Sequence, residues 1–188
     1  GTNMSYTFSR RDFMKYTALT AVAIAGSSML TGCSNPNQPT GTIGSTLKPG
    51  DGICEATLLS GASKPSYTAG GNVLVCHFKI KSLIAGLQVS QGHFQVDVTG
   101  GEHPGSYNVN THPTGVAAAT FELTGGNDAT TKNQVLPDVA LTVTGIDLTG
   151  ATNVAVRYCP KHSADENGKD LYNDIYATWN ITASDLGL

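Results

Sequence analysis

The sequence is poor in charge and in aromatic residues, and both scarcities exclude classes of protein. Charged residues make up 13% of the 188 residues, and the formal net charge is −3. A nucleic-acid-binding domain normally carries a basic excess, so we expect no nucleic-acid partner. Aromatic residues make up 7%, whereas glycine occurs 22 times. This composition is typical of many short strands joined by turns and argues against a helical bundle.

The common enzyme motifs are also absent from the sequence. There is no G-x-S-x-G, no H-E-x-x-H, no glycine-rich phosphate loop after a strand and no C-x-x-C. Asp97, Glu122 and Asp147 lie on faces that we expect to point outward, and the sequence gives no reason to pair any two of them as an acid and a base. We therefore expect a protein that is not an enzyme.

The first 33 residues have the layout of an export signal. Two adjacent arginines, Arg10 and Arg11, and Lys15 precede an uncharged stretch over 16–30 that reads YTALTAVAIAGSSML. A positive segment followed by a short apolar segment is typical of a signal peptide. The apolar segment falls short of the roughly 20 residues that a membrane-spanning helix needs.

Two motifs in this segment resemble known bacterial signals. The run S-R-R-D-F-M-K resembles the twin-arginine (Tat) export signal, and L-T-G-C at 30–33 resembles a lipobox. The resemblance implies that Arg10 and Arg11 direct export, that residues 1–32 are removed, and that Cys33 is lipidated. Two or more acyl chains are enough for stable anchoring. We therefore expect a lipoprotein held by Cys33 on the outer face of the bacterial cytoplasmic membrane.

The segment that follows is rich in Pro, Gly, Ser, Thr and Asn. It reads SNPNQPTGTIGSTLKPGD over 34–51 and contains almost no apolar residue. Such a composition buries too little surface to offset the entropy of ordering the chain. We predict a flexible tether over 33–51 and a folded domain over 52–188.

From residue 53 onward, apolar and polar residues alternate with a period of two. In Val73–Lys81, Leu74, Cys76, Phe78 and Ile80 share one face, and His77, Lys79 and Lys81 share the other. Similar alternation recurs over 94–98, 120–123, 139–144, 154–158 and 177–181. This pattern indicates strands with one buried and one solvated face, and we expect Trp179 near the centre of the core.

The strands are separated by clusters of turn residues such as 69–72 and 125–128. Seven or eight short strands with this spacing predict an all-β, antiparallel β-sandwich. The layout of Val73–Ile80, Phe94–Val98, the L-P-D turn at 136–138 and Ala177–Ile181 also resembles the small immunoglobulin-like domains of bacterial surface lipoproteins. That resemblance implies an immunoglobulin-like sandwich and a non-catalytic surface domain.

Three cysteines remain if Cys33 is lipidated: Cys54, Cys76 and Cys159. An odd number leaves at least one thiol unpaired in a monomer. Residue parity places Cys54 and Cys76 inward and Cys159 outward. If 53–60 and 72–81 form a hairpin, Cys54 and Cys76 come within a residue or two of facing each other. We favour that disulfide, and the absence of any disulfide or a pairing through Cys159 remain alternatives.

Cys159 and His162 form the most suggestive ligand pair for a metal. They faintly resemble the copper-binding loop of cupredoxins, which needs a second histidine that His93, His103 or His112 could supply. The usual axial methionine is missing, because all three methionines precede residue 30. We expect no metal cofactor, with copper at Cys159 and His162 as the alternative.

The acidic loop over 165–170 has the oxygen ligands that calcium prefers. However, Gly168 comes too early for an EF-hand loop, and Asp174 stands where that loop needs glutamate. We expect a solvated loop without calcium.

These observations predict a membrane-anchored binding or interaction module whose partner is a protein, a glycan or a small molecule. The alternative is a copper-binding or redox lipoprotein.

Overall fold

The computed structural model describes residues 37–49, 52–162 and 176–188, without the side chains of Lys161 and His162. Within these ranges the regular structure consists of β-strands and three short 3-10 turns: η1 (Gly61–Ser63), η2 (Gln91–His93) and η3 (Ser184–Leu186). Seven of the described strands are five residues or longer. The predicted all-β sandwich of seven or eight main strands is therefore confirmed.

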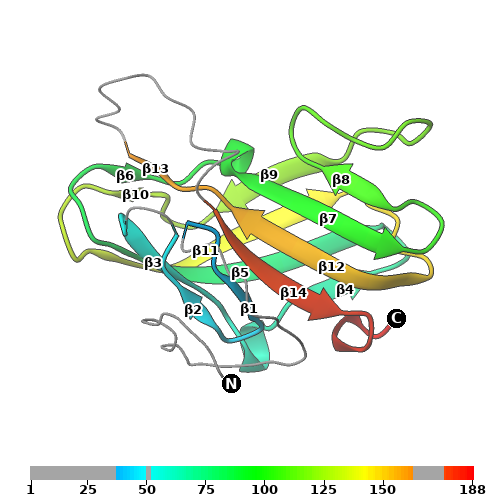
Figure 1. Ribbon diagram of the computed structural model, residues 1–188, viewed down its shortest axis with the longest axis horizontal. Helices are drawn as coiled ribbons and strands as arrows, with labels where there is room; N and C mark the ends of the chain where they lie inside the picture. The colour runs from blue at the N-terminus through cyan, green and yellow to red at the C-terminus, as the bar shows by residue number, and fades with distance from the viewer. Residues whose placement is uncertain (1–36, 50–51, 163–175) are drawn as a thin grey trace.

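The first large sheet has five strands (Figure 1). Its order is β1 (Thr40–Thr42), β14 (Ala177–Thr182), β12 (Ala151–Tyr158), β7 (Phe94–Gly100) and β8 (Gly105–Tyr107). Three of its four pairings are antiparallel, and only β1 runs parallel to its neighbour, β14. An antiparallel sheet can bury one face and keep the other in water, as the sequence alternation requires.

The second large sheet has six strands and lies behind the first in Figure 1. Its order is β2 (Thr46–Leu47), β3 (Cys54–Leu58), β5 (Val73–Ser82), β11 (Val135–Thr144) and β9 (Thr120–Thr124), and β4 (Ser66–Thr68) pairs with β5. A small third sheet, at the left in Figure 1, contains β10 (Asp128–Ala129), β6 (Leu87–Gln88) and β13 (Lys161–His162).

Aromatic rings from the two large sheets meet in the core. Phe78 of β5 packs against Trp179 of β14 and Phe94 of β7, with ring centroids 5.1 and 5.4 Å apart. Phe94 stacks on Tyr158 at 4.9 Å. All four side chains are fully buried, so these contacts hold the two sheets face to face. Trp179 is the largest of the fully buried side chains, as the sequence predicted.

The predicted tether is wrong for residues 37–49, which belong to the sandwich. Strands β1 and β2 lie at the edges of different sheets, so this segment crosses from one layer to the other. The Trp179 indole N–H donates a hydrogen bond to Ser45 O at 2.9 Å, and Ile43 and Leu47 pack against the core. Edge strands are held mainly by backbone hydrogen bonds, which a lack of apolar side chains does not reveal.

Among the described residues, no helix combines the length and the apolar character needed to cross a membrane.

Candidate functional site

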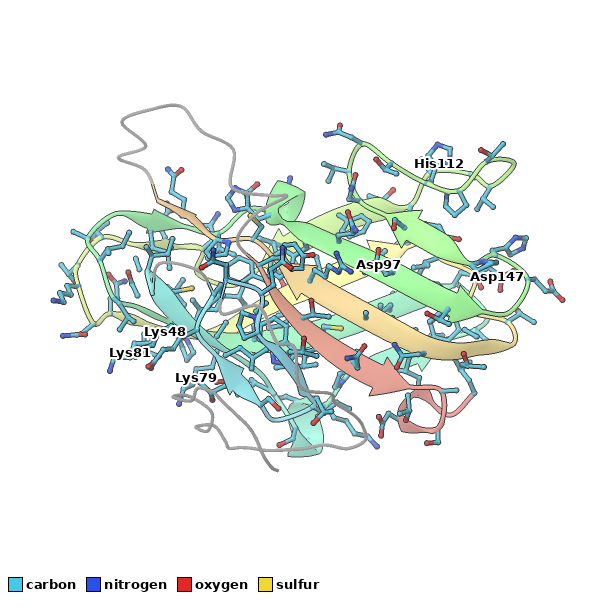
Figure 2. All side chains as sticks on the ribbon, in the orientation of Figure 1. Lys48, Lys79, Lys81, Asp97, His112 and Asp147 are labelled. Atoms are coloured by element: carbon cyan, nitrogen blue, oxygen red, sulfur yellow. The ribbon has the colours of Figure 1, made fainter. Side chains whose placement is uncertain are left out.

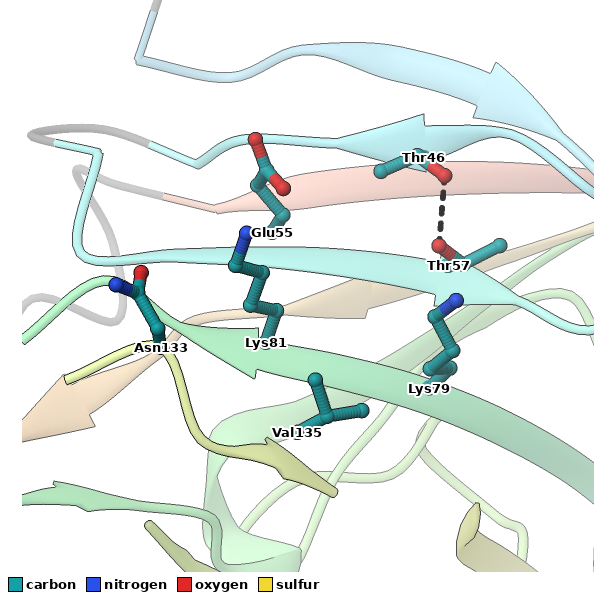
Figure 3. A pocket seen from close by; sticks show the side chains of 7 residues that line it. All are labelled: Thr46, Glu55, Thr57, Lys79, Lys81, Asn133 and Val135. Atoms are coloured by element: carbon teal, nitrogen blue, oxygen red, sulfur yellow. Dashed lines mark hydrogen bonds between the residues drawn. The ribbon is translucent and has the colours of Figure 1, made fainter. Parts of the chain in front are cut away.

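A hollow on the solvent face of the six-stranded sheet is the first candidate site. Its volume is about 620 Å³, and it opens across β2, β3, β5 and the start of β11 (Figure 3). Strand alternation produces this polar surface, because the inward-facing neighbours of the same strands are buried. The hollow is lined by Thr46, Glu55, Thr57, Lys79, Lys81, Asn133 and Val135.

Cross-strand register determines which side chains lie opposite one another in the hollow. Lys81 is opposite Glu55, and Lys79 is opposite Thr57. The hydroxyls of Thr46 and Thr57 lie 2.7 Å apart and share a hydrogen bond. Figure 3 shows both lysines extending across β3. Neither lysine forms an ion pair with a carboxylate in the described part of the chain, although Lys81 extends toward the Glu55 side chain in Figure 3.

The sequence placed Lys79 and Lys81 correctly on the outward face of their strand. The sequence did not indicate a hollow there, because parity assigns residues to a face but does not determine which strands become neighbours. Asn133 comes from the loop before β11 and joins the hollow only through the pairing of β5 with β11.

A polar network covers part of the outer face of the first sheet. Asp97 Oδ2 pairs with Arg157 Nε at 2.9 Å, and Asp97 Oδ1 accepts hydrogen bonds from Gln95 and Ser106. The Arg157 guanidinium lies over the Tyr176 ring, 4.7 Å from its centroid. Each oxygen of the Asp97 carboxylate thus has a partner within this network, which is typical of a structural carboxylate.

A third group of ionisable side chains lies at one end of the sandwich. Glu102 and His103 follow β7, and Asp147 lies between β11 and β12. One ligand atom from each lies within 4.8 Å of the others. The pKa of Asp147 is lowered, chiefly by the hydrogen bond from the Thr149 hydroxyl and then by that from its backbone N–H. The sequence analysis considered His103 as a metal ligand and Asp147 as an outward-facing acid, but nothing in their local spacing indicated that they lie close together.

The third acid considered in the sequence, Glu122, is exposed on β9. Asp97, Glu122 and Asp147 therefore lie on two different strands and one loop. Figure 2 shows Asp97 and Asp147 well apart in its view.

The favoured Cys54–Cys76 disulfide is wrong. Both thiols point into the core, as parity predicted, but Cys54 lies opposite Ser82 and not near Cys76. Six residues along an extended strand separate Cys76 from Ser82, roughly 20 Å. Cys54, Cys76 and Cys159 form no disulfide with one another, and burial raises the pKa of Cys54 and of Cys76 to about 12.

The prediction that Cys159 points outward is also wrong, because its exposed fraction is 3%. The alternation of β12 ends at Tyr158, and the chain then leaves the sheet toward β13 in the third sheet. Parity holds only within a strand, so it does not apply to Cys159. The Cys159 N–H donates to His93 O at 2.9 Å, which places the backbone of one candidate histidine beside this cysteine.

Several predictions concern residues that lie outside the described ranges. These are the export signal at Arg10 and Arg11, the lipid attachment at Cys33 and the acidic loop over 165–170, together with Asp174. The side chain of His162, the second residue of the suggested copper pair, is also outside the described part.

No protein-family model, no curated protein and no solved structure matches the chain.

Proposed function

We propose that this chain is a non-catalytic binding module, anchored by a lipid on Cys33 to the outer face of a bacterial cytoplasmic membrane. The S-R-R-D-F-M-K run and the L-T-G-C motif support export and anchoring. The immunoglobulin-like layout of the strands supports a surface domain. The partner is a protein, a glycan or a small molecule that approaches an exposed sheet face.

One observation supports binding most strongly: the hollow presents lysine ammonium groups that lack an ion-pair partner among the described residues. The Thr46 and Thr57 hydroxyls and the Asn133 amide add donors and acceptors beside them. The exposed Val135 side chain supplies an apolar edge. These groups suit a ligand that carries hydroxyls and one anionic group, such as an acidic saccharide.

A binding screen with matched lysine variants tests this proposal. The full chain is tested against neutral and acidic saccharides, and any ligand found is titrated into Lys79→Ala, Lys81→Ala and Lys64→Ala. Loss of one charge-assisted hydrogen bond costs roughly 1.5–3 kcal/mol, so we expect affinity to fall about tenfold or more in the first two variants. Lys64 is exposed and outside the hollow, so Lys64→Ala should bind normally. Equal affinity in all three variants would reject the hollow as the site.

Anchoring is tested on the native protein. Mass spectrometry should show a lipid-modified Cys33 at the N-terminus, and Cys33→Ala should release the protein or leave the precursor uncut. Replacing Arg10 and Arg11 together by lysine should block export. Export that continues without the Tat machinery would contradict the twin-arginine interpretation.

The non-catalytic assignment is tested with a broad panel of hydrolase substrates. We expect no turnover above background. Turnover that disappears when a single acid or histidine is substituted would show that the protein is an enzyme.

The alternative, a copper-binding or redox lipoprotein, rests on the Cys159 and His162 pair, and a hydrogen bond from the Cys159 N–H to His93 O brings the backbone of one candidate second histidine beside Cys159. Elemental analysis and a visible spectrum of the purified protein separate the two functions. A stoichiometric metal that is lost in Cys159→Ser or His162→Ala would favour the alternative.

A further inference from the structure

Glu102, His103 and Asp147 combine one imidazole with two carboxylates, and one ligand atom from each lies within 4.8 Å of the others. Nitrogen and oxygen donors of these kinds are the usual protein ligands of zinc, together with cysteine sulfur. We propose that these three side chains bind a divalent transition-metal ion of the zinc class. The site is distinct from the hollow and from the Cys159 and His162 pair.

The separation between the imidazole and one carboxylate fits a shared ion better than a direct contact. His103 Nε2 and Asp147 Oδ2 lie 3.5 Å apart, beyond the usual 2.7–3.2 Å of an N–H···O hydrogen bond. Two ligands of a tetrahedral ion with bonds of about 2.0–2.1 Å lie about 3.4 Å apart. An ion can therefore bridge these two atoms with little movement of either side chain.

The Asp147 carboxylate is already oriented for this role. The backbone N–H and the hydroxyl of Thr149 donate to Oδ1 at 3.0 and 2.6 Å. These bonds leave Oδ2 directed toward His103. Metal-binding carboxylates are commonly held by such hydrogen bonds, because fixing the ligand lowers the entropy lost on binding.

The two loops that carry the ligands are joined to each other and to the sheet. The Glu102 N–H donates to Thr149 O at 3.1 Å, and the Tyr107 hydroxyl donates to His103 O at 2.9 Å. The loops approach so closely at Gly101 that an added Cβ would lie 2.5 Å from Thr149 O. The backbone that carries these ligands is thus held in place before a metal arrives.

The ligand set also predicts which cations bind. Calcium and magnesium prefer all-oxygen coordination, whereas imidazole suits zinc, copper and nickel. The side chains of His103 and Asp147 are about one-third exposed, at 36% and 32%. Water or a group from a partner molecule can therefore complete the coordination shell.

Zinc titration of the full chain, purified without a polyhistidine tag, tests the proposal by isothermal calorimetry. We expect one equivalent of Zn²⁺ to bind and no heat from Ca²⁺ at the same concentrations. His103→Ala and Asp147→Asn should each weaken Zn²⁺ binding at least tenfold. Asparagine keeps an oxygen that can accept from Thr149, so Asp147→Asn separates lost coordination from lost folding. Glu102→Gln alters an exposed residue and should weaken binding without changing the melting temperature of the metal-free protein.

Two controls determine whether the signal comes from this site. His112→Ala removes an exposed histidine in the loop that follows β8, and a double variant with Cys159→Ser and His162→Ala removes the other suggested metal pair. Both should bind Zn²⁺ like the wild type. Loss of binding in the double variant, unchanged binding in His103→Ala and Asp147→Asn, or no binding up to millimolar Zn²⁺ would each overturn the proposal.

Discussion

The Tyr67 hydroxyl joins two turns that are far apart in the sequence, and removing it provides a sharp test of the fold. Tyr67 Oη accepts a hydrogen bond from the Leu148 N–H at 3.1 Å. Its single proton is shared between Asn72 Oδ1 at 2.9 Å and Ile146 O at 3.0 Å. Ile146 and Leu148 are fully buried, so the backbone groups of this loop have few alternative partners.

Tyr67→Phe removes one oxygen atom and leaves the ring in place. The Leu148 N–H then lacks an acceptor, and an unsatisfied buried polar group costs about 1–3 kcal/mol. We expect the free energy of unfolding to fall by about 2 kcal/mol. For a domain of this size, that corresponds to a melting temperature lower by roughly 4–8 °C.

Urea unfolding of wild type, Tyr67→Phe and Tyr176→Phe measures this effect. Tyr176 is the matched control, because its half-buried hydroxyl accepts one hydrogen bond from Arg157 at 3.0 Å. The Arg157 side chain is 36% exposed, so water can replace the lost bond and Tyr176→Phe should cost less than about 1 kcal/mol. The urea dependence should be the same in all three proteins. A loss below about 0.5 kcal/mol in Tyr67→Phe, or an equal loss in both variants, would refute the reasoning.

Three further predictions concern the buried thiols, the buried Trp179 side chain and the close approach of two loops at Gly101. The Cys54 and Cys76 thiols have an ordinary pKa of 9.0 and a native pKa of about 12. The unfolded chain therefore loses these protons first as the pH rises, and stability should fall above pH 9 by about 1.4 kcal/mol per thiol per pH unit. Urea unfolding at pH 8, 9 and 10 should show a shallower pH dependence in Cys54→Ala or Cys76→Ala, and an unchanged slope would contradict the buried thiols. Trp179→Phe removes a core hydrogen-bond donor and part of a buried ring, so urea unfolding should show a loss of about 2–4 kcal/mol, whereas a loss below 1 kcal/mol would place Trp179 outside the core. Gly101 has a φ of +80°, and in Gly101→Ala the new carbon would lie 2.5 Å from Thr149 O. We expect thermal unfolding to show a loss of at least about 2 kcal/mol in the free energy of unfolding. Wild-type stability of this variant would show that the two loops lie farther apart.

The main strands and their buried faces could be predicted because alternation is a local property of the sequence. Leu74, Cys76, Phe78 and Ile80 are all buried, as their shared parity required. Phe94, Val96 and Val98 behave in the same way on β7. In both strands each apolar residue gains free energy by leaving water, so the alternation can be read without knowing which strands are neighbours.

Strand register and the edge strands could not be predicted in this way. An alternation with a period of two specifies the face on which a residue lies. It does not distinguish a register with Cys54 opposite Cys76 from one with Cys54 opposite Ser82. Strand β1 carries almost no apolar signal and depends on backbone bonds to β14. The prediction for Cys159 failed for a related reason. The chain changes direction after β12 ends, and this change buries Cys159.

The candidate sites depend on contacts that are distant in the sequence. His103 and Asp147 are 44 residues apart and meet because their loops leave the same end of the sandwich. The hollow likewise needs the pairing of β3 with β5 to bring Thr57 opposite Lys79. The residue types indicated which side chains could belong to a site. Only the topology shows which of them lie together.

The parallel pairing of β1 with β14 affects how the domain responds to mechanical force. The first and last of the described strands run side by side, and the N–H groups of Tyr176 and Thr178 donate to Asn37 O and Pro39 O. A pull on the two chain ends in opposite directions therefore acts along both strands and shears these bonds simultaneously, whereas a hairpin pulled at its open end would lose them one at a time. Forced unfolding is governed by the height of the barrier to rupture, and shear raises that barrier. A domain fixed at its N-terminal end and pulled from its C-terminal end thus carries the load on the strand pair that closes the sandwich.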